Sequence, residues 1–119
     1  MDVLAVEQAL RELRPLNPEV SVRSWHRGDA YECGLIAFQP PAAGTPAASA
    51  GEAEQILHRD RDVLCHVLRG AGRLRLADES RDIGPGLLCR VPAGTPHDFA
   101  ATGTEPLVLY YTLIRVAPA

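Results

Sequence analysis

Lysine is absent from this chain of 119 residues, whose 12 basic residues are all arginine. Without lysine the chain cannot form the Schiff base that holds pyridoxal phosphate, and it cannot carry a Walker-type phosphate-binding loop. The sequence also has no Gly-x-Ser-x-Gly nucleophile elbow and no Gly-x-Gly-x-x-Gly turn that opens a helix. These absences exclude several large classes of enzyme.

An excess of positive charge and a long apolar run are missing as well. The net charge is −3, so the chain lacks the electrostatic footprint of a protein that binds nucleic acid or anionic lipid. The longest apolar stretch, Pro106–Ile114, is far shorter than the ~20 residues that a membrane helix needs. The N-terminus has no basic segment followed by an apolar run, so we expect no signal peptide and no membrane partner.

Cysteine is scarce, with single residues at Cys33, Cys65 and Cys89. An odd number of widely spaced cysteines argues against a disulfide framework and against a zinc ribbon. Each lies in an apolar, strand-like run, where a cysteine typically acts as a small buried hydrophobe. These unpaired thiols favour a cytoplasmic location.

Short strand-like segments fill the chain after an N-terminal helix. The spacing of apolar residues over Val3–Leu13 predicts a short amphipathic helix that ends before Pro15. Many short strands at intervals of roughly 8–12 residues are typical of a β-sandwich or barrel. The predicted strands are Val20–Trp25, Tyr31–Phe38, Asp62–Leu68, Gly72–Ala77, Leu87–Val91 and Leu107–Arg115, with another beginning at His97.

A single domain over residues 1–119 is expected from this length, and 46% hydrophobic residues are enough to fill one core. The Pro- and Ala-rich segment 40–51 is predicted to be an exposed loop, because the chain is too short to be divided there. We therefore expect an N-terminal helical segment at residues 1–15 and a barrel core that carries the functional motifs at residues 56–114.

The strongest functional signal is the segment Gly86–His97, in which a strand leaves a glycine turn and a Pro-Ala-Gly corner precedes His97. It resembles the second motif of the cupin superfamily: Gly, five residues, Pro, one residue, Gly, two residues, His. Every one of these positions matches, although Ala101 replaces the Asn that ends the family motif. The resemblance implies an all-β fold, a jelly-roll barrel or double-stranded β-helix, with His97 as a metal ligand that points inward.

The first cupin motif, which holds two His and one Glu before a Gly turn, is degenerate here. Its clearest anchor is the segment Val67–Gly72. In the preferred register, His58 takes the second His position, Asp62 takes the Glu position, and Ile56 replaces the first His. This register keeps a carboxylate where the family has one.

Two features leave the first motif open to a different alignment. The gap from Asp62 to Gly70 is one residue too long, and a strict count back from Gly70 puts the Glu position at Val63. In an alternative register, His58 takes the first His position and Asp60 the second, while the Glu position falls on Leu64. The carboxylate of the site is therefore Asp62 or Asp60.

The preferred register implies a metal site made of His58, Asp62 and His97. Two imidazoles and a carboxylate suit a divalent transition metal such as Fe, Mn, Ni or Zn, with positions left open for water or substrate. Because side chains alternate along a strand, His66 shares a face with Asp62. If that face points into the barrel, His66 is the candidate catalytic residue for proton transfer.

Three functions fit this pattern. The first is a metal-dependent enzyme of oxygenase, isomerase or lyase type that acts on a small organic molecule. The second is a metal-free or vestigial barrel that binds a small ligand without catalysis, which the missing motif ligands favour. The third is a structural role as a dimer scaffold. We expect a homodimer, because small barrels have exposed sheet edges that pairing can cover, and Val3–Leu13 and Val20–Trp25 could supply the contact between the subunits.

Overall fold

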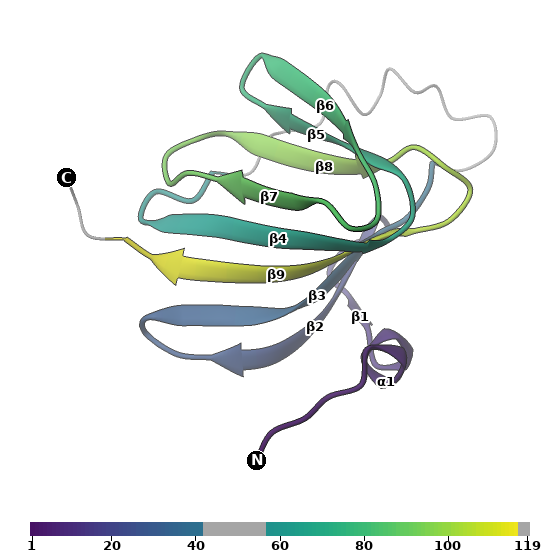
Figure 1. The fold of residues 1–119 in the computed structure, drawn as a ribbon, viewed down its shortest axis with the longest axis vertical. Helices are drawn as coiled ribbons and strands as arrows, with labels where there is room; N and C mark the ends of the chain where they lie inside the picture. The colour runs from purple at the N-terminus through teal and green to yellow at the C-terminus, as the bar shows by residue number, and fades with distance from the viewer. Residues whose placement is uncertain (42–56, 117–119) are drawn as a thin grey trace.

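Two antiparallel β-sheets face each other in the computed structural model, which describes residues 1–41 and 57–116 (Figure 1). The one helix of these ranges, α1, spans Val6–Arg11 and is shorter than the predicted Val3–Leu13. The strands are β1 (Arg14–Pro15), β2 (Val20–Arg27), β3 (Tyr31–Phe38), β4 (Arg61–Arg69), β5 (Gly72–Leu76), β6 (Glu79–Ile83), β7 (Leu88–Val91), β8 (His97–Ala101) and β9 (Leu107–Arg115).

The larger sheet has the strand order β1-β2-β3-β9-β4-β7, and the smaller sheet has the order β6-β5-β8. The expected all-β architecture with one short N-terminal helix is confirmed, and the bounds of β3 and β9 match the prediction. The strand β6, which begins at Glu79, was not among the predicted strands. Ala77, with a φ of 50°, lies in the turn between β5 and β6, so β5 ends one residue before the predicted bound.

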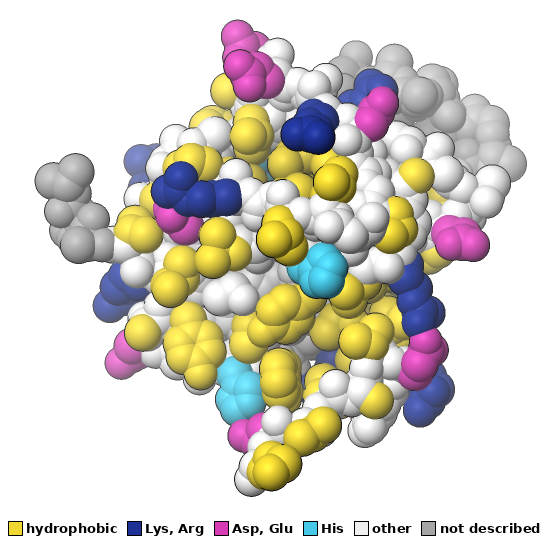
Figure 2. Space-filling view, viewed as in Figure 1, with side chains coloured by type: hydrophobic (Ala, Val, Ile, Leu, Met, Phe, Trp, Pro, Cys, Tyr) yellow, Lys and Arg dark blue, Asp and Glu magenta, His cyan; other side chains and the backbone are white. Residues whose placement is uncertain are grey.

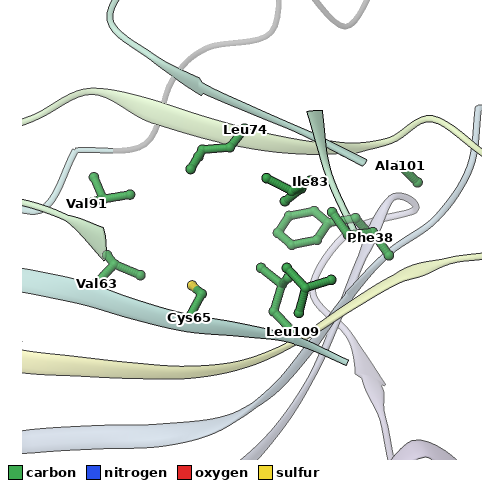
Figure 3. Packing of buried hydrophobic residues seen from close by; sticks show 10 residues of the cluster. Phe38, Val63, Cys65, Leu74, Ile83, Val91, Ala101 and Leu109 are labelled. Atoms are coloured by element: carbon green, nitrogen blue, oxygen red, sulfur yellow. The ribbon is translucent and has the colours of Figure 1, made fainter. Parts of the chain in front are cut away.

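The hydrophobic core lies between the two sheets, on the inner face of the larger one. Alternation along β4 turns Val63, Cys65 and Val67 toward the smaller sheet, where Leu74 and Ile83 meet them (Figure 3). Fully burying an apolar side chain of this size contributes about 1.5–3 kcal/mol relative to leaving it in water. The core therefore fixes which face of β4 points inward.

The outer face of the larger sheet is covered in part by α1. Ala9 is fully buried there and packs with Leu35, Ala37 and Val108. The helix therefore packs against the sheet of its own chain, through its one buried residue and apolar side chains of β3 and β9. Within the described ranges, no helix is long and apolar enough to cross a membrane.

Candidate functional site in the barrel cavity

A cavity of about 1160 Å³ lies inside the barrel, against the inner face of the larger sheet. This volume is slightly above that of typical small-molecule pockets, which is roughly 300–1,000 Å³. Its apolar wall includes Ile36, Phe38, Cys65 and Leu109, whereas polar side chains gather elsewhere on its lining. The polar and charged lining residues are Arg11, Glu12, Arg14, Arg23, Ser24, Arg27, Glu32, His58, His97 and Tyr111.

His97 lies at the start of β8 and is only 3% exposed. The corner before it turns at Gly94, whose φ of +82° favours glycine. The Nδ1 atom of His97 lies 3.1 Å from the Thr95 carbonyl oxygen. A proton on Nδ1 would be donated to that oxygen, which would leave Nε2 with a free lone pair. His97 therefore lines the cavity, as the sequence motif predicted, with one nitrogen available to a ligand.

His58 precedes β4 and lies beside His97. The two ring centroids are 5.6 Å apart, and the Gly94 N–H donates a 2.7 Å hydrogen bond to the His58 carbonyl oxygen. The corner that positions His97 therefore also holds the backbone of His58. Burial lowers the pKa of His58, and its electrostatic interaction with the neighbouring His97 ring lowers it further. The lowered pKa favours a neutral imidazole at this position near pH 7.

Asp62 points away from the cavity, which corrects the expectation that it faces His97. Its Oδ2 accepts hydrogen bonds from Arg90 Nε at 3.0 Å and Arg90 Nη2 at 2.8 Å. Its Oδ1 accepts a 2.8 Å hydrogen bond from the Ala93 N–H. The reason is the strand period: its neighbour Val63 faces the core, so Asp62 must face the opposite side.

The contacts of Asp62 give it a structural role in this fold. They join the start of β4 to β7 through Arg90 and to the corner at Ala93, only four residues before His97. The Ala93 N–H and the Arg90 guanidinium both lower the pKa of Asp62, so the carboxylate stays ionised at neutral pH. Asp62 thus helps to hold the segment that positions His97 without touching the cavity.

His66 and Asp60 are not brought to the cavity either. His66 is exposed on the same outer face as Asp62, with Leu88 and Tyr110 as its strand partners. The proposed proton-transfer role of His66 is corrected by this placement, again because alternate residues of β4 face outward. Asp60, the carboxylate of the alternative register, is exposed and does not line the cavity. Ile56 lies outside the described residues.

Glu12 and Glu32 are the carboxylates that the structure places in the cavity lining, and sequence reasoning missed both; Glu32 lies on the inner face of the larger sheet. Its Oε1 lies 3.1 Å from Arg61 Nη1, and its Oε2 lies 3.3 Å from Arg27 Nε. Its parity on β3 is the signal that could have found it, because Ile36 and Phe38 at even positions are apolar and face inward. An acidic residue at an even position of this strand, such as Glu32, is therefore expected to face the cavity and not the solvent.

A three-ligand metal site is not formed by the described residues. Across residues 1–41 and 57–116, no group of three His, Cys, Asp or Glu side chains is placed to hold a metal ion. Catalytic zinc sites typically use three protein ligands, and among the residues that the structure describes only the imidazoles of His58 and His97 lie side by side. Asp62 faces away from the cavity that His58 and His97 line, so the described residues do not form the predicted metal site of His58, Asp62 and His97.

Comparison with known proteins agrees with this architecture. A family model described as a cupin domain matches residues 45–113, more than half of the chain. The chain belongs to the cupin superfamily. A search of curated proteins found no match.

Three solved structures show the same cupin fold. The protein TT1209 from Thermus thermophilus is 21% identical with a TM-score of 0.73, and the match covers 97% of this chain and 98% of that one. KdgF from a Halomonas species is 21% identical with a TM-score of 0.67, covering 87% and 88%. A predicted oxalate decarboxylase from Thermotoga maritima is 16% identical with a TM-score of 0.66, covering 82% and 81%. At these identities, the likeness concerns the fold alone.

Proposed function

We propose that this cupin binds a small organic molecule in its barrel cavity, at His58 and His97, without requiring a metal. The observation that carries the proposal is the pair of imidazoles on the lining of a cavity with an apolar wall. A pocket of this kind buries the apolar part of a ligand, and a few polar groups fix its orientation. The neutral His58 ring and the Nε2 of His97 are suited to hydrogen bonding with such a ligand.

The charge of the lining favours an anionic ligand. Four arginines and two glutamates line the cavity, so its described lining has an excess of positive charge, although the whole chain carries −3. Glu32 is shared between Arg27 and Arg61, so this group of three side chains has one net positive charge. Arginine side chains recognise carboxylates well because of their forked geometry. We therefore infer that the ligand is a small carboxylate with an apolar body.

The test is a binding measurement with matched pairs of probes. Benzoate and hexanoate, each compared with its neutral amide, would be titrated into the wild type with a chelator present. We expect the carboxylates to bind more tightly than the amides. His97→Ala should weaken carboxylate binding at least tenfold, a loss of about 1.4 kcal/mol in binding free energy.

The matched control is His66→Ala, which removes the same side chain from the exposed outer face. It should bind both carboxylates like the wild type. Equal affinity of wild type and His97→Ala would contradict the proposal. Binding that appears only after Fe(II), Mn, Ni or Zn is added, and that needs His97, would instead support the metal-dependent function that the sequence predicted.

A homodimer also remains a proposal, and the exposed outer face is its best candidate surface. Leu64, Leu88 and Ile114 are 41%, 79% and 40% exposed and lie on the adjacent strands β4, β7 and β9. Hydrophobic side chains gather over these strands in Figure 2, with charged side chains mainly toward the rim. Sedimentation velocity should show a dimer for the wild type and a monomer for Leu88→Glu. A monomeric wild type at high micromolar concentration would contradict this.

A further inference from the structure

Two of the three cysteines lie directly opposite each other on neighbouring strands. Cys65 of β4 pairs with Cys89 of β7, and both belong to or pack against the core between the sheets. Both are free thiols. Opposite residues in antiparallel strands have Cα atoms about 4.5 or 5.5 Å apart, and both distances lie within the roughly 4.4–6.8 Å that a disulfide spans.

A disulfide between Cys65 and Cys89 would carry some strain. Opposite Cβ atoms in a sheet are about 4.5–5.5 Å apart, whereas a disulfide prefers about 3.5–4.5 Å. The two strands would therefore have to approach slightly when the bond forms. Strained disulfides have higher reduction potentials and reopen easily, so the bond should form under oxidising conditions and be readily reversible.

The surroundings of the two thiols differ and set the order of reaction. Cys89 is partly exposed and lines a second cavity of about 280 Å³ between β7 and the β5–β6 hairpin, together with Arg81. Cys65 is 6% exposed on the wall of the main cavity. Burial raises the pKa of Cys65 to about 12. Burial raises the pKa of Cys89 as well, and the positive charge of Arg81 lowers it in part. Cys89 is therefore the thiol that an external reagent meets first.

We propose that Cys65 and Cys89 form a reversible dithiol site that a small-molecule disulfide, such as oxidised glutathione, converts to a protein disulfide. The Cys89 thiolate attacks one sulfur of the reagent, forms a mixed disulfide and releases one glutathione thiolate. Cys65, after losing its proton, attacks the Cys89 sulfur and releases the second. The two protein sulfurs lose two electrons, the reagent gains them, and both thiol protons pass to the leaving glutathiones.

The test is to equilibrate the folded protein in glutathione buffers of rising potential, block remaining thiols and measure intact mass. We expect the oxidised protein to carry one blocking group where the reduced protein carries three, and to be about 2 Da lighter than reduced protein with that single group. Cleavage after arginine should then yield the peptides Asp62–Arg69 and Asp82–Arg90 joined together, since each contains one of the two cysteines. Added dithiothreitol should separate them.

Three variants identify the pairing. Cys33→Ala should form the same bond as the wild type, because Cys33 faces the outer side of β3 opposite His26 and Thr112. Cys65→Ala should stop at a glutathione adduct on Cys89, whereas Cys89→Ala should react much more slowly. Wild-type protein that stays fully reduced in the most oxidising buffer, or that links Cys33 instead, would overturn the proposal. The wild-type peptide result stands even if a variant fails to fold.

Discussion

The two faces of the larger sheet carry different chemistry, and the strand β4 contributes to both. On its inner face, Val63 and Cys65 border the core and a cavity that His58 and His97 line. On its outer face, Asp62 holds a neighbouring strand and His66 is exposed. A shift of one residue in a strand therefore decides whether a polar side chain belongs to a binding site or to the scaffold.

The largest expected effect is a loss of stability when a buried side chain is removed from the inner face of the larger sheet. Leu107→Ala removes a side chain that is fully buried on the inner face, and it should lower the free energy of unfolding by about 2–5 kcal/mol. Leu88→Ala on the outer face, where the side chain is 79% exposed in the single chain, should change it by no more than about 0.5 kcal/mol at protein concentrations too low for the proposed dimer to form. Denaturant unfolding measures both. Similar losses in the two variants would contradict the assignment of the faces.

A second expected effect concerns the scaffold role of Asp62. Asp62→Ala should lower the melting temperature, because the Ala93 N–H and Arg90 lose their acceptor. Asp60→Ala, which removes an exposed carboxylate two residues earlier, should have a smaller effect.

The acid dependence of the Asp62→Ala effect sharpens this prediction. The pKa of Asp62 is lowered in the folded chain, so its contribution to stability is present above the unfolded carboxyl pKa of about 3.9. That contribution is lost as the pH falls through the lower folded pKa. The stability difference between wild type and variant should therefore shrink only in strong acid. A difference that disappears near neutral pH would contradict the ion pair.

A third prediction changes the charge inside the cavity. Glu32→Gln removes a carboxylate from the lining and should raise the affinity for benzoate by about 2–10-fold, because it removes a nearby like charge. Asp82→Asn removes an exposed carboxylate that pairs with Arg73 on the smaller sheet, and it should leave the affinity unchanged. Isothermal titration of both variants is the measurement. Weaker benzoate binding by Glu32→Gln would argue against an anionic ligand.

The smallest expected effect is the pH dependence that His58 gives to stability. Its pKa is lowered by burial, so the unfolded chain binds the proton more readily than the folded one. Stability should therefore decline as the pH falls below about 6.5 toward the lower folded pKa. His58→Gln should reduce this decline, and urea unfolding between pH 8 and pH 5 would detect it. A variant with the wild-type slope would show that His58 is not desolvated.

Much of the fold could be predicted from the sequence because its signals are local. Strands β3 and β9 are dense in apolar residues and bounded by turns, and their ends were predicted as the structure has them. The strand β6 has a polar surface pattern without an apolar signal, so it was missed. The edge strand β1 was not predicted either, because it is only two residues long and forms only by pairing with β2.

The site was predicted less completely, for a physical reason. His97 belongs to a nearly intact motif whose glycine corner fixes its backbone, so its place on the cavity lining could be anticipated. The face of Asp62 depends on the register of β4 against β7 and β9, which a damaged motif does not specify. Glu32 comes from β3, outside the motifs, and joins the cavity only through tertiary structure. The pairing of Cys65 with Cys89 likewise arises only when β4 meets β7.

The most direct test of the central claim follows all four histidine side chains at once. Imidazole signals of the wild type, assigned by single substitutions, would be recorded by NMR during a benzoate titration in the presence of a chelator. The account predicts that the signals of His58 and His97 shift together, while those of His26 and His66 stay in place. A shift confined to His66, or equal shifts of all four, would show that the ligand does not bind in the barrel cavity.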